Sequence, residues 1–389
     1  MSGLTFHTEG EPLRKEEKKV EYLELIYDLI FVYIIGRNNS LLHHVENGFV
    51  PGTTFLAYVL CSLAIIQIWN FSTYYINMHG RNGVRDHVAL FLNMYLLYYI
   101  GEGTRLHWES FQNQYCVAWA LILLNIGTQY AIELRSHREE PAVQRAIRRM
   151  MIVLYGEALL VLLAIPVYNR TGAALTAVPI LYGIVMTRVF ADDTKAELVD
   201  FTHLSERAML YVVFTFGEMI IAIASYFEGD FTLSSVYFSL MCFLIVAGLF
   251  LCYELLYDRI IDREQKTTGI GYMIVHIFLL FGMNNLTTSL EFMRDEEVAV
   301  WPKTLFLVVS FVLYFACLFA LQRYARRERS LCRRTVAPVV VLTLVFAGLM
   351  LLLRQHMRLN ILLSVLYVGA IFLWILRFSR EEPGAPEQD

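Results

Sequence analysis

The sequence predicts an all-α integral membrane protein of about twelve transmembrane helices, arranged as two parallel six-helix halves with pseudo-twofold symmetry. The chain has 389 residues, of which 57% are hydrophobic and only 17% are charged, with a mean hydropathy of +0.49. This is more apolar surface than the core of a soluble domain needs. Apolar runs of about 20 residues also recur along the whole chain, and the basic residues cluster in every second connection between them.

Twelve apolar runs divide into two sets of six, and each run is long enough to cross a hydrocarbon layer of ~30 Å as a helix. The first six lie at 20–37, 53–76, 87–103, 115–134, 150–168 and 172–190. The second six lie at 208–227, 233–257, 270–290, 303–322, 335–353 and 359–377. The predicted organisation is a cytoplasmic N-terminal segment at 1–19, a first half at 20–190, a cytoplasmic connection at 191–207, a second half at 208–377 and a cytoplasmic tail at 378–389.

Lysine and arginine divide unequally between the two sets of loops. With the N-terminus inside the cell, the cytoplasmic set holds 25 of the 32 basic residues and the outer set holds 7. This bias predicts that both termini are cytoplasmic. The first nineteen residues are charged and lack the apolar centre of a cleavable signal peptide, so the first span is expected to stay in the mature protein.

The two halves are weakly similar to each other at a spacing of 181 to 190 residues. The aligned pairs are Asp28 with Glu218, Tyr75 with Tyr257, Arg81 with Arg263 and Leu97 with Leu279. An even number of spans in each half makes such repeats parallel, related by an axis along the membrane normal. A binding site is therefore expected at the interface between the halves.

Composition argues against several other classes of protein. A formal charge of −4 and a pI near 6.2 leave no overall basic face for nucleic acid. The six cysteines form no CxxC pair, and five of them lie in or beside apolar runs, so neither a disulfide framework nor a zinc site is indicated. The expected partners are the lipid bilayer and a small solute or ion, and no metal, cofactor or catalytic residue is predicted. A homo-oligomer is left open.

Charged and polar side chains inside the apolar runs are the candidate functional residues, because a charge at the bilayer centre costs about 2.5 to 3.5 kcal/mol. Glu24 and Asp28 stack on one face of the first run. Glu218 lies near the middle of the seventh run, with no basic residue within a helical turn. The candidates for carrying a proton or binding a ligand are Asp28, Glu218, Glu24, Glu157 and His276. A role in helix packing is the alternative for each of them.

A buried ion pair is expected at the start of the seventh run. Arg207 is expected to pair with Glu24, because both lie near the cytoplasmic third of their spans, and Glu206 is a further candidate for a structural ion pair. Asp28 and Glu218 are expected to face one central cavity. Two carboxyl groups close together in a low dielectric cannot both ionise cheaply, so the expectation is a shared proton.

Two strings in these segments resemble the low temperature requirement protein A family. The first runs ELIYDLIFV from Glu24 to Val32 and matches the family's ELFFDLVFV string, with Ile26 and Tyr27 where the family often has two Phe. The second is an ER pair separated by nine residues from a GE pair, which is also the family's spacing. The resemblance implies a multispan protein of the bacterial cytoplasmic membrane, associated with growth in the cold. Its characteristic polar positions map to Glu24, Asp28, Glu206, Arg207 and Glu218.

Three kinds of function fit these observations. The preferred hypothesis is a transporter or channel-like protein, with proton coupling as an option, that uses Asp28 and Glu218 as paired acidic positions. The second is a membrane-embedded enzyme acting on a lipid, but the chain lacks HxxxH clusters and a GxSxG elbow, which favours a non-enzyme. The third is a membrane-state sensor or assembly factor in which the carboxylates only fix packing.

Overall fold

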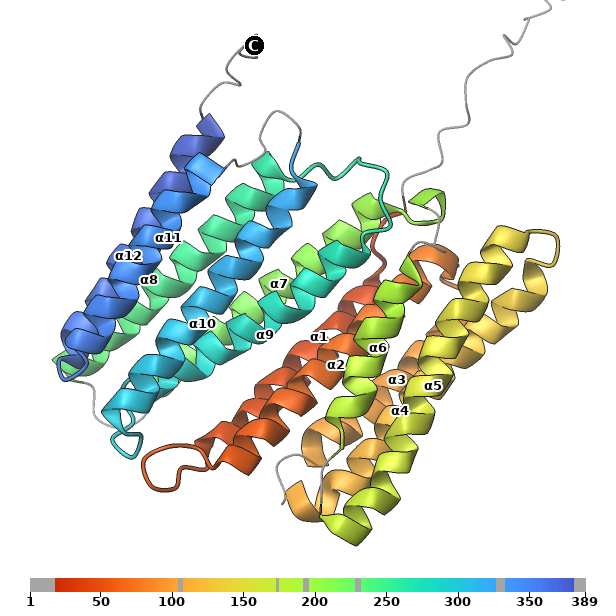
Figure 1. Cartoon of the computed structure of the whole chain (residues 1–389), viewed down its shortest axis with the longest axis horizontal. Helices are drawn as coiled ribbons and strands as arrows, with labels where there is room; N and C mark the ends of the chain where they lie inside the picture. The colour runs from red at the N-terminus through yellow and green to blue at the C-terminus, as the bar shows by residue number, and fades with distance from the viewer. Residues whose placement is uncertain are drawn as a thin grey trace, which may run out of the picture.

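A computed structural model describes residues 18–103, 108–172, 175–191, 196–227, 232–326 and 333–380. Within these ranges the chain forms twelve α-helices joined by short connections, and its only β-type pairing is two isolated bridges (Figure 1). The first six helices are α1 (Tyr22–Asn38), α2 (Gly52–His79), α3 (Val84–Gly103), α4 (Trp108–Ser136), α5 (Pro141–Thr171) and α6 (Ala177–Val189). The second six are α7 (Phe201–Ile223), α8 (Leu233–Leu255), α9 (Ile270–Phe292), α10 (Val300–Ala320), α11 (Arg333–Leu352) and α12 (Met357–Arg380).

Local signals explain where several of these helices begin and end. The Asp200 side chain accepts a hydrogen bond from the His203 N–H and so caps α7, and Thr232 caps α8 in the same way. Proline occupies the start of α5, where its missing N–H costs nothing, and Gly172 closes that helix with a φ of 70°. α7 begins at Phe201, so its first two turns lie inside the range 191–207 expected to be a cytoplasmic connection and precede the apolar run at 208–227.

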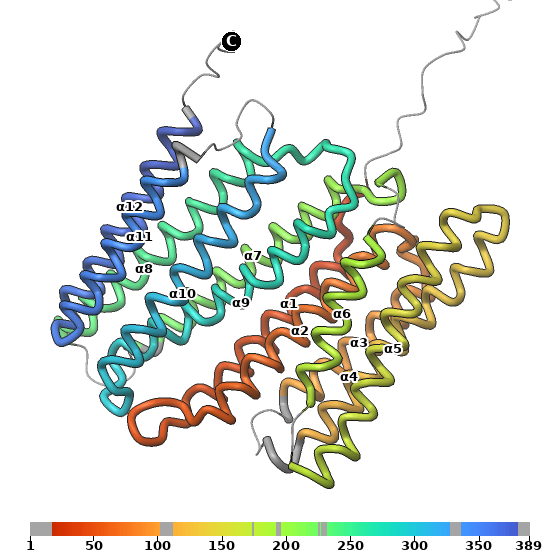
Figure 2. The backbone as a smooth tube through the Cα atoms, viewed as in Figure 1, coloured from red at the N-terminus to blue at the C-terminus, as the bar shows by residue number. Residues whose placement is uncertain are grey.

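Seven of the described helical segments are long and apolar enough to cross a membrane: Gly52–His79, Gln112–Ser136, Pro141–Thr171, Leu233–Ile260, Ile270–Phe292, Val300–Tyr324 and Met357–Ser379. Two shorter apolar segments are Ala177–Val189 and Val336–Leu352. The apolar windows of α2 and α9 are 72% and 78% buried, whereas those of α5 and α12 are 39% buried. The chain is therefore a polytopic helical membrane protein with α2 and α9 at its centre, as Figure 2 also shows.

Helices of the two sets pack with corresponding neighbours. α1 lies against α2 and α3, and α7 lies against α8 and α9. Three more contacts within the first set have a counterpart in the second set. The α3–α4 contact corresponds to α9–α10, the α2–α6 contact to α8–α12, and the α5–α6 contact to α11–α12. The two sets meet mainly where α1 packs on α7 and α2 packs on α9, in the middle of the bundle (Figure 1).

The connections alternate between the two ends of the bundle. At one end, the chain around Lys18 contacts Asp200 at the start of α7, and the end of α2 reaches the segment before α9 through a hydrogen bond from Tyr74 to the Thr268 carbonyl. At the other end, the loop after α1 bonds the segment before α10 through the Ala299 N–H and the Gly48 carbonyl. α1 begins and α12 ends at the same end of the bundle (Figure 1).

Candidate functional site

A buried cluster of charged side chains joins α1 to α7. Arg207 donates a hydrogen bond to Oδ1 of Asp28, and its Nη1 lies 3.4 Å from Oε2 of Glu24. The same Glu24 oxygen lies 3.3 Å from Nε2 of His203. Trp69 of α2 donates a 2.8 Å hydrogen bond to Asp28 Oδ1. Arg207, Asp28 and His203 have no exposed surface and Glu24 is 4% exposed, so these charges lie out of reach of bulk water.

A hydrogen-bond chain fixes how His203 presents its ring. The Asp200 N–H donates to Oδ1 of Asn77, which leaves the Asn77 amide nitrogen pointing at Nδ1 of His203, 3.0 Å away. An amide nitrogen can only donate, so Nδ1 of His203 is the acceptor and Nε2 carries the ring proton toward Glu24. A neutral His203 therefore faces the carboxylate with its N–H.

The formal charges of the cluster do not cancel. Two carboxyl groups, Glu24 and Asp28, surround a single guanidinium, and the imidazole beside them is neutral in the tautomer described. Within the described residues, Oδ2 of Asp28, Nε of Arg207 and the hydroxyl of Tyr211 make no hydrogen bond although all three are buried. Such groups usually find a partner. Counted alone, the cluster carries one excess negative charge, and the ammonium group of Lys18 beside Glu24 offsets part of it.

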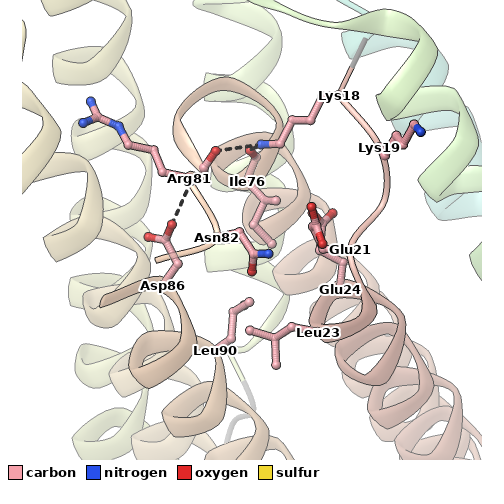
Figure 3. A pocket seen from close by; sticks show the side chains of 11 residues that line it. Lys18, Lys19, Glu21, Leu23, Glu24, Ile76, Arg81, Asn82, Asp86 and Leu90 are labelled. Carbon is pink, nitrogen blue, oxygen red and sulfur yellow. Dashed lines mark hydrogen bonds between the residues drawn. The ribbon is translucent and has the colours of Figure 1, made fainter. Parts of the chain in front are cut away.

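A polar cavity of about 340 Å³ opens beside this cluster, at the end of the bundle where α1 begins. Its polar lining residues are Lys18, Lys19, Glu21, Glu24, Arg81, Asn82 and Asp86. Figure 3 shows Glu21 and Glu24 projecting from α1 toward the turn that carries Asn82. Glu24 belongs to both the cavity wall and the ion cluster, so it links the cavity to Arg207.

Lys18 lies over the mouth of this cavity (Figure 3). Its ammonium group donates hydrogen bonds to the carbonyl oxygens of Ile76 and Gly80 at the end of α2. Burial lowers the pKa of Lys18, and the nearby Glu24 carboxylate opposes that shift. The lysine thus ties the chain before α1 to the end of α2 and places a positive charge close to the acidic wall.

Aromatic rings close the α1–α7 interface on the other side of the cluster. Tyr27 and Phe31 of α1 pack edge to face with centroids 4.9 Å apart, and Tyr211 of α7 packs on Trp69 at 4.6 Å and on Phe31 at 6.4 Å. All four side chains are buried. This aromatic layer separates the charged cluster from the rest of the interface.

Glu218 lies beyond the aromatic layer on the same interface. It is partly buried, and its carboxylate packs directly against the Cα of Gly36 on α1. Because Gly36 follows Asp28 by eight residues, the two carboxyl groups are separated by about 12 Å of helix. Asp28 and Glu218 are therefore not in contact, and the close pair assumed for a shared proton is not seen. α1 and α7 run parallel, so α7 presents Arg207 at the height of Asp28 and Glu218 three turns further on.

Glu157 lies in a different place, between α2, α5 and α6. It is fully buried, Gln67 donates a 3.4 Å hydrogen bond to its Oε2, and the backbone of Gly183 closes against both side chains. No cation lies within ion-pair distance of this carboxyl among the described residues. Glu157 is thus a separate buried acid of the first set of helices.

His276 and Glu206 also lie outside the cluster. Both ring nitrogens of His276 are occupied, by the Tyr272 carbonyl at 2.9 Å and the Tyr253 hydroxyl at 3.0 Å, so it joins α9 to α8. Glu206 is partly buried beside Arg207, but no ion pair of Glu206 is found in the part of the chain described. Arg207, Glu24 and Asp28 are the sequence candidates that the fold brings together.

Three members of the site were not among the candidates predicted from sequence: His203, Trp69 and Asn77. His203 lies four residues before Arg207, the spacing of one helical turn, and that register was the available signal. Trp69 and Asn77 belong to a long apolar helix with no charge pattern, so only the tertiary structure identifies them.

Comparison with family models gives a match over residues 19–371 to the family described as Bacterial low temperature requirement A protein (LtrA). Comparison with curated proteins and with solved structures gives no match. The matched range includes the whole charged cluster, the cavity wall at Glu24 and the Glu218 position.

Proposed function

The chain belongs to the bacterial low temperature requirement A protein family. We propose that it is a transporter or channel-like protein with a polar site between two six-helix halves. In this proposal all twelve helices cross the bacterial cytoplasmic membrane, and both termini are cytoplasmic. The corresponding helix contacts of the two sets and the alternation of the connections support this arrangement. The two halves are then parallel repeats, with α1 and α7 as equivalent helices side by side.

The observation that carries the proposal is the charged cluster at the α1–α7 interface. Ionisable side chains inside a membrane protein are expensive and usually mark a solute, ion or proton pathway. Here the cluster of Glu24, Asp28 and Arg207 adjoins a cavity on one side and an aromatic layer on the other. In the conformation described the cluster is closed off beyond Phe31 and Tyr211, and Glu24 is its one member on the cavity wall, so access from the cavity would have to pass Glu24.

Proton coupling follows from the charge balance of the cluster. With two carboxyl groups around one guanidinium, uptake of one proton would neutralise the excess negative charge of the cluster. His203 can receive that proton only by releasing Asn77 from Nδ1. Protonation would therefore be linked to the contact between α2 and α7, and a small cation entering from the cavity would compete for the same negative charge.

Flux measurements on the purified chain in liposomes test the proposal. Vesicles carrying a pH-sensitive dye are challenged in turn with gradients of protons, alkali cations and small anions. The wild type should carry one of these ions. Asp28→Asn should abolish the flux or its pH dependence. Glu139→Gln, in an exposed loop, is the control and should leave both the flux and its pH dependence unchanged. A wild type that is folded and inserted but carries none of these ions would favour a sensor or assembly role.

A further inference from the structure

A second polar cluster lies at the end of the bundle where α2 and α4 finish. It consists of His79, the last residue of α2, with Glu133 in the last turn of α4 and His137 just after that helix. One possible ligand atom from each residue lies within 4.8 Å of the others. Two imidazoles and one carboxylate at such distances are the donor set that zinc and other divalent transition metals take in proteins.

Within the described part of the chain, each histidine has a ring nitrogen that is free to bind a ligand. His137 follows Glu133 by four residues, so both project from one helix face. Nδ1 of His137 lies 3.0 Å from the main-chain carbonyl of Glu133, which fixes a tautomer with Nε2 free to bind, an arrangement common among metal-binding histidines. Among the described residues the ring of His79 makes no hydrogen bond, and it is held by ring contacts to Tyr75, Tyr130 and His137.

Glu133 already binds cations with both of its oxygens. Its carboxylate is 1% exposed; Arg85 bonds Oε1, and Nη2 of Arg81 lies 3.4 Å from Oε2. Oε2 also lies 3.8 Å from Nδ1 of His137. The Arg81 side chain is 66% exposed, so it can swing into solvent at little cost, whereas Arg85 also bonds the Tyr75 hydroxyl.

We propose that His79, Glu133 and His137 form a binding site for a divalent transition metal ion, and that Arg81 competes with the ion for the Glu133 carboxylate. In the conformation described, the guanidinium of Arg81 supplies the positive charge. When the ion binds, Oε2 of Glu133 exchanges Arg81 for the metal, and Oε1 keeps Arg85. The main-chain N–H of Arg81 bonds Asp86 on the cavity wall, so this exchange takes place next to the turn that lines the cavity.

Binding of Co²⁺ and Zn²⁺ to the full-length protein, purified without a histidine tag, tests the site. Co²⁺ is followed by its visible absorption and Zn²⁺ by equilibrium dialysis with metal analysis. One ion should bind per chain. His79→Gln and His137→Gln should each weaken binding at least about tenfold, the size of effect that losing a supporting contact alone can have. Arg81→Gln should tighten binding, because it removes the competing cation. His356→Gln, an exposed histidine elsewhere, should leave the affinity unchanged.

The opposite responses of His137→Gln and Arg81→Gln separate this site from adventitious binding. If both variants bind like the wild type, or if Arg81→Gln weakens binding, the site is disproved. Folding is checked by size-exclusion chromatography and by the shift in thermal midpoint on adding metal. His137 is at the end of α4 and less buried than Glu133, so His137→Gln keeps the test decisive even if His79→Gln fails to fold.

Discussion

Nη1 of Arg207 lies 3.4 Å from the Glu24 carboxylate while the same guanidinium bonds Asp28, so a single cation on α7 holds two acids one turn apart on α1. These helices begin the two sets of six. The ion pair is therefore the polar part of the contact that joins the sets, surrounded by apolar packing of α1 and α2 against α7 and α9.

Removing this cation should destabilise the protein strongly. Arg207→Gln leaves two buried carboxyl groups without their partner, which typically costs about 3 to 5 kcal/mol. The free energy of unfolding in detergent measures the loss, and the exposed Arg138→Gln serves as the control, with a change within about 0.5 kcal/mol. Adding Glu24→Gln and Asp28→Asn to Arg207→Gln should recover part of the loss. Equal stability of the Arg207 and Arg138 variants would contradict the assignment.

Gly36→Ala should displace the Glu218 carboxylate. A Cβ at Gly36 would overlap Oε1 of Glu218, the end of a flexible side chain, so the carboxyl group should turn away while the helices stay packed. We expect Gly36→Ala to match Glu218→Gln in the flux assay, because both variants remove the carboxyl group from this position, and to lose little stability. Gly217→Ala is the matched control, because a Cβ there meets nothing within 4 Å. A defect in Gly217→Ala as large as in Gly36→Ala would refute this explanation.

Gly183→Ala should destabilise the first set of helices. The added methyl group would overlap Gln67 and Glu157, two buried side chains with no room to retreat, and overpacking of this kind costs about 1 to 3 kcal/mol. Gly348→Ala, where a Cβ meets open space, should be neutral or slightly stabilising. Thermal unfolding of both variants in the same detergent makes the comparison, and equal midpoints would show that α2, α5 and α6 pack less tightly than described.

The contact between His43 and Glu291 should strengthen at low pH. Nε2 of His43 lies 3.2 Å from Oε2 of Glu291, and this hydrogen bond raises the pKa of His43, with Asp295 acting in the same sense. A raised pKa means that the stabilisation is complete below the unfolded value of about 6.5 and is lost as the pH rises through the folded value. The thermal midpoint of wild type minus that of His43→Gln should therefore be larger at pH 5.5 than at pH 9. His356→Gln, at an exposed histidine with no carboxylate contact among the described residues, is the control, and a pH-independent difference for His43→Gln would contradict the pair.

Cysteine labelling tests the orientation in the membrane. In a Cys332→Ser background, Glu139→Cys in the α4–α5 loop should react only with reagent inside the cell, and His44→Cys after α1 only with reagent outside. The five described cysteines are buried and should stay silent. Labelling of Glu139→Cys from outside would invert the topology.

Hydropathy and charge were enough to predict the helices, because a membrane span needs about 20 apolar residues whatever it packs against. The family and the pairing of Arg207 with Glu24 also followed from local strings and register. The start of α7 could not be predicted in this way. Its first turns carry buried polar residues that bond α1 and α2, and in a hydropathy profile such polar residues look like a loop. The grouping of His79 with Glu133 had no sequence signal either, since these residues lie on different helices, 54 positions apart.

The position of Arg207 has a consequence for biogenesis. A lone buried arginine in a membrane helix is costly to insert, by about 2.5 to 3.5 kcal/mol for one at the bilayer centre and less nearer the interface. Both acidic partners of Arg207 are on α1, which leaves the ribosome some 180 residues earlier. The N-terminal half would therefore have to be inserted in the bilayer before α7 can pack in its final position. The first helix would serve as a docking template inside the membrane, and the chain would assemble in the order of its synthesis.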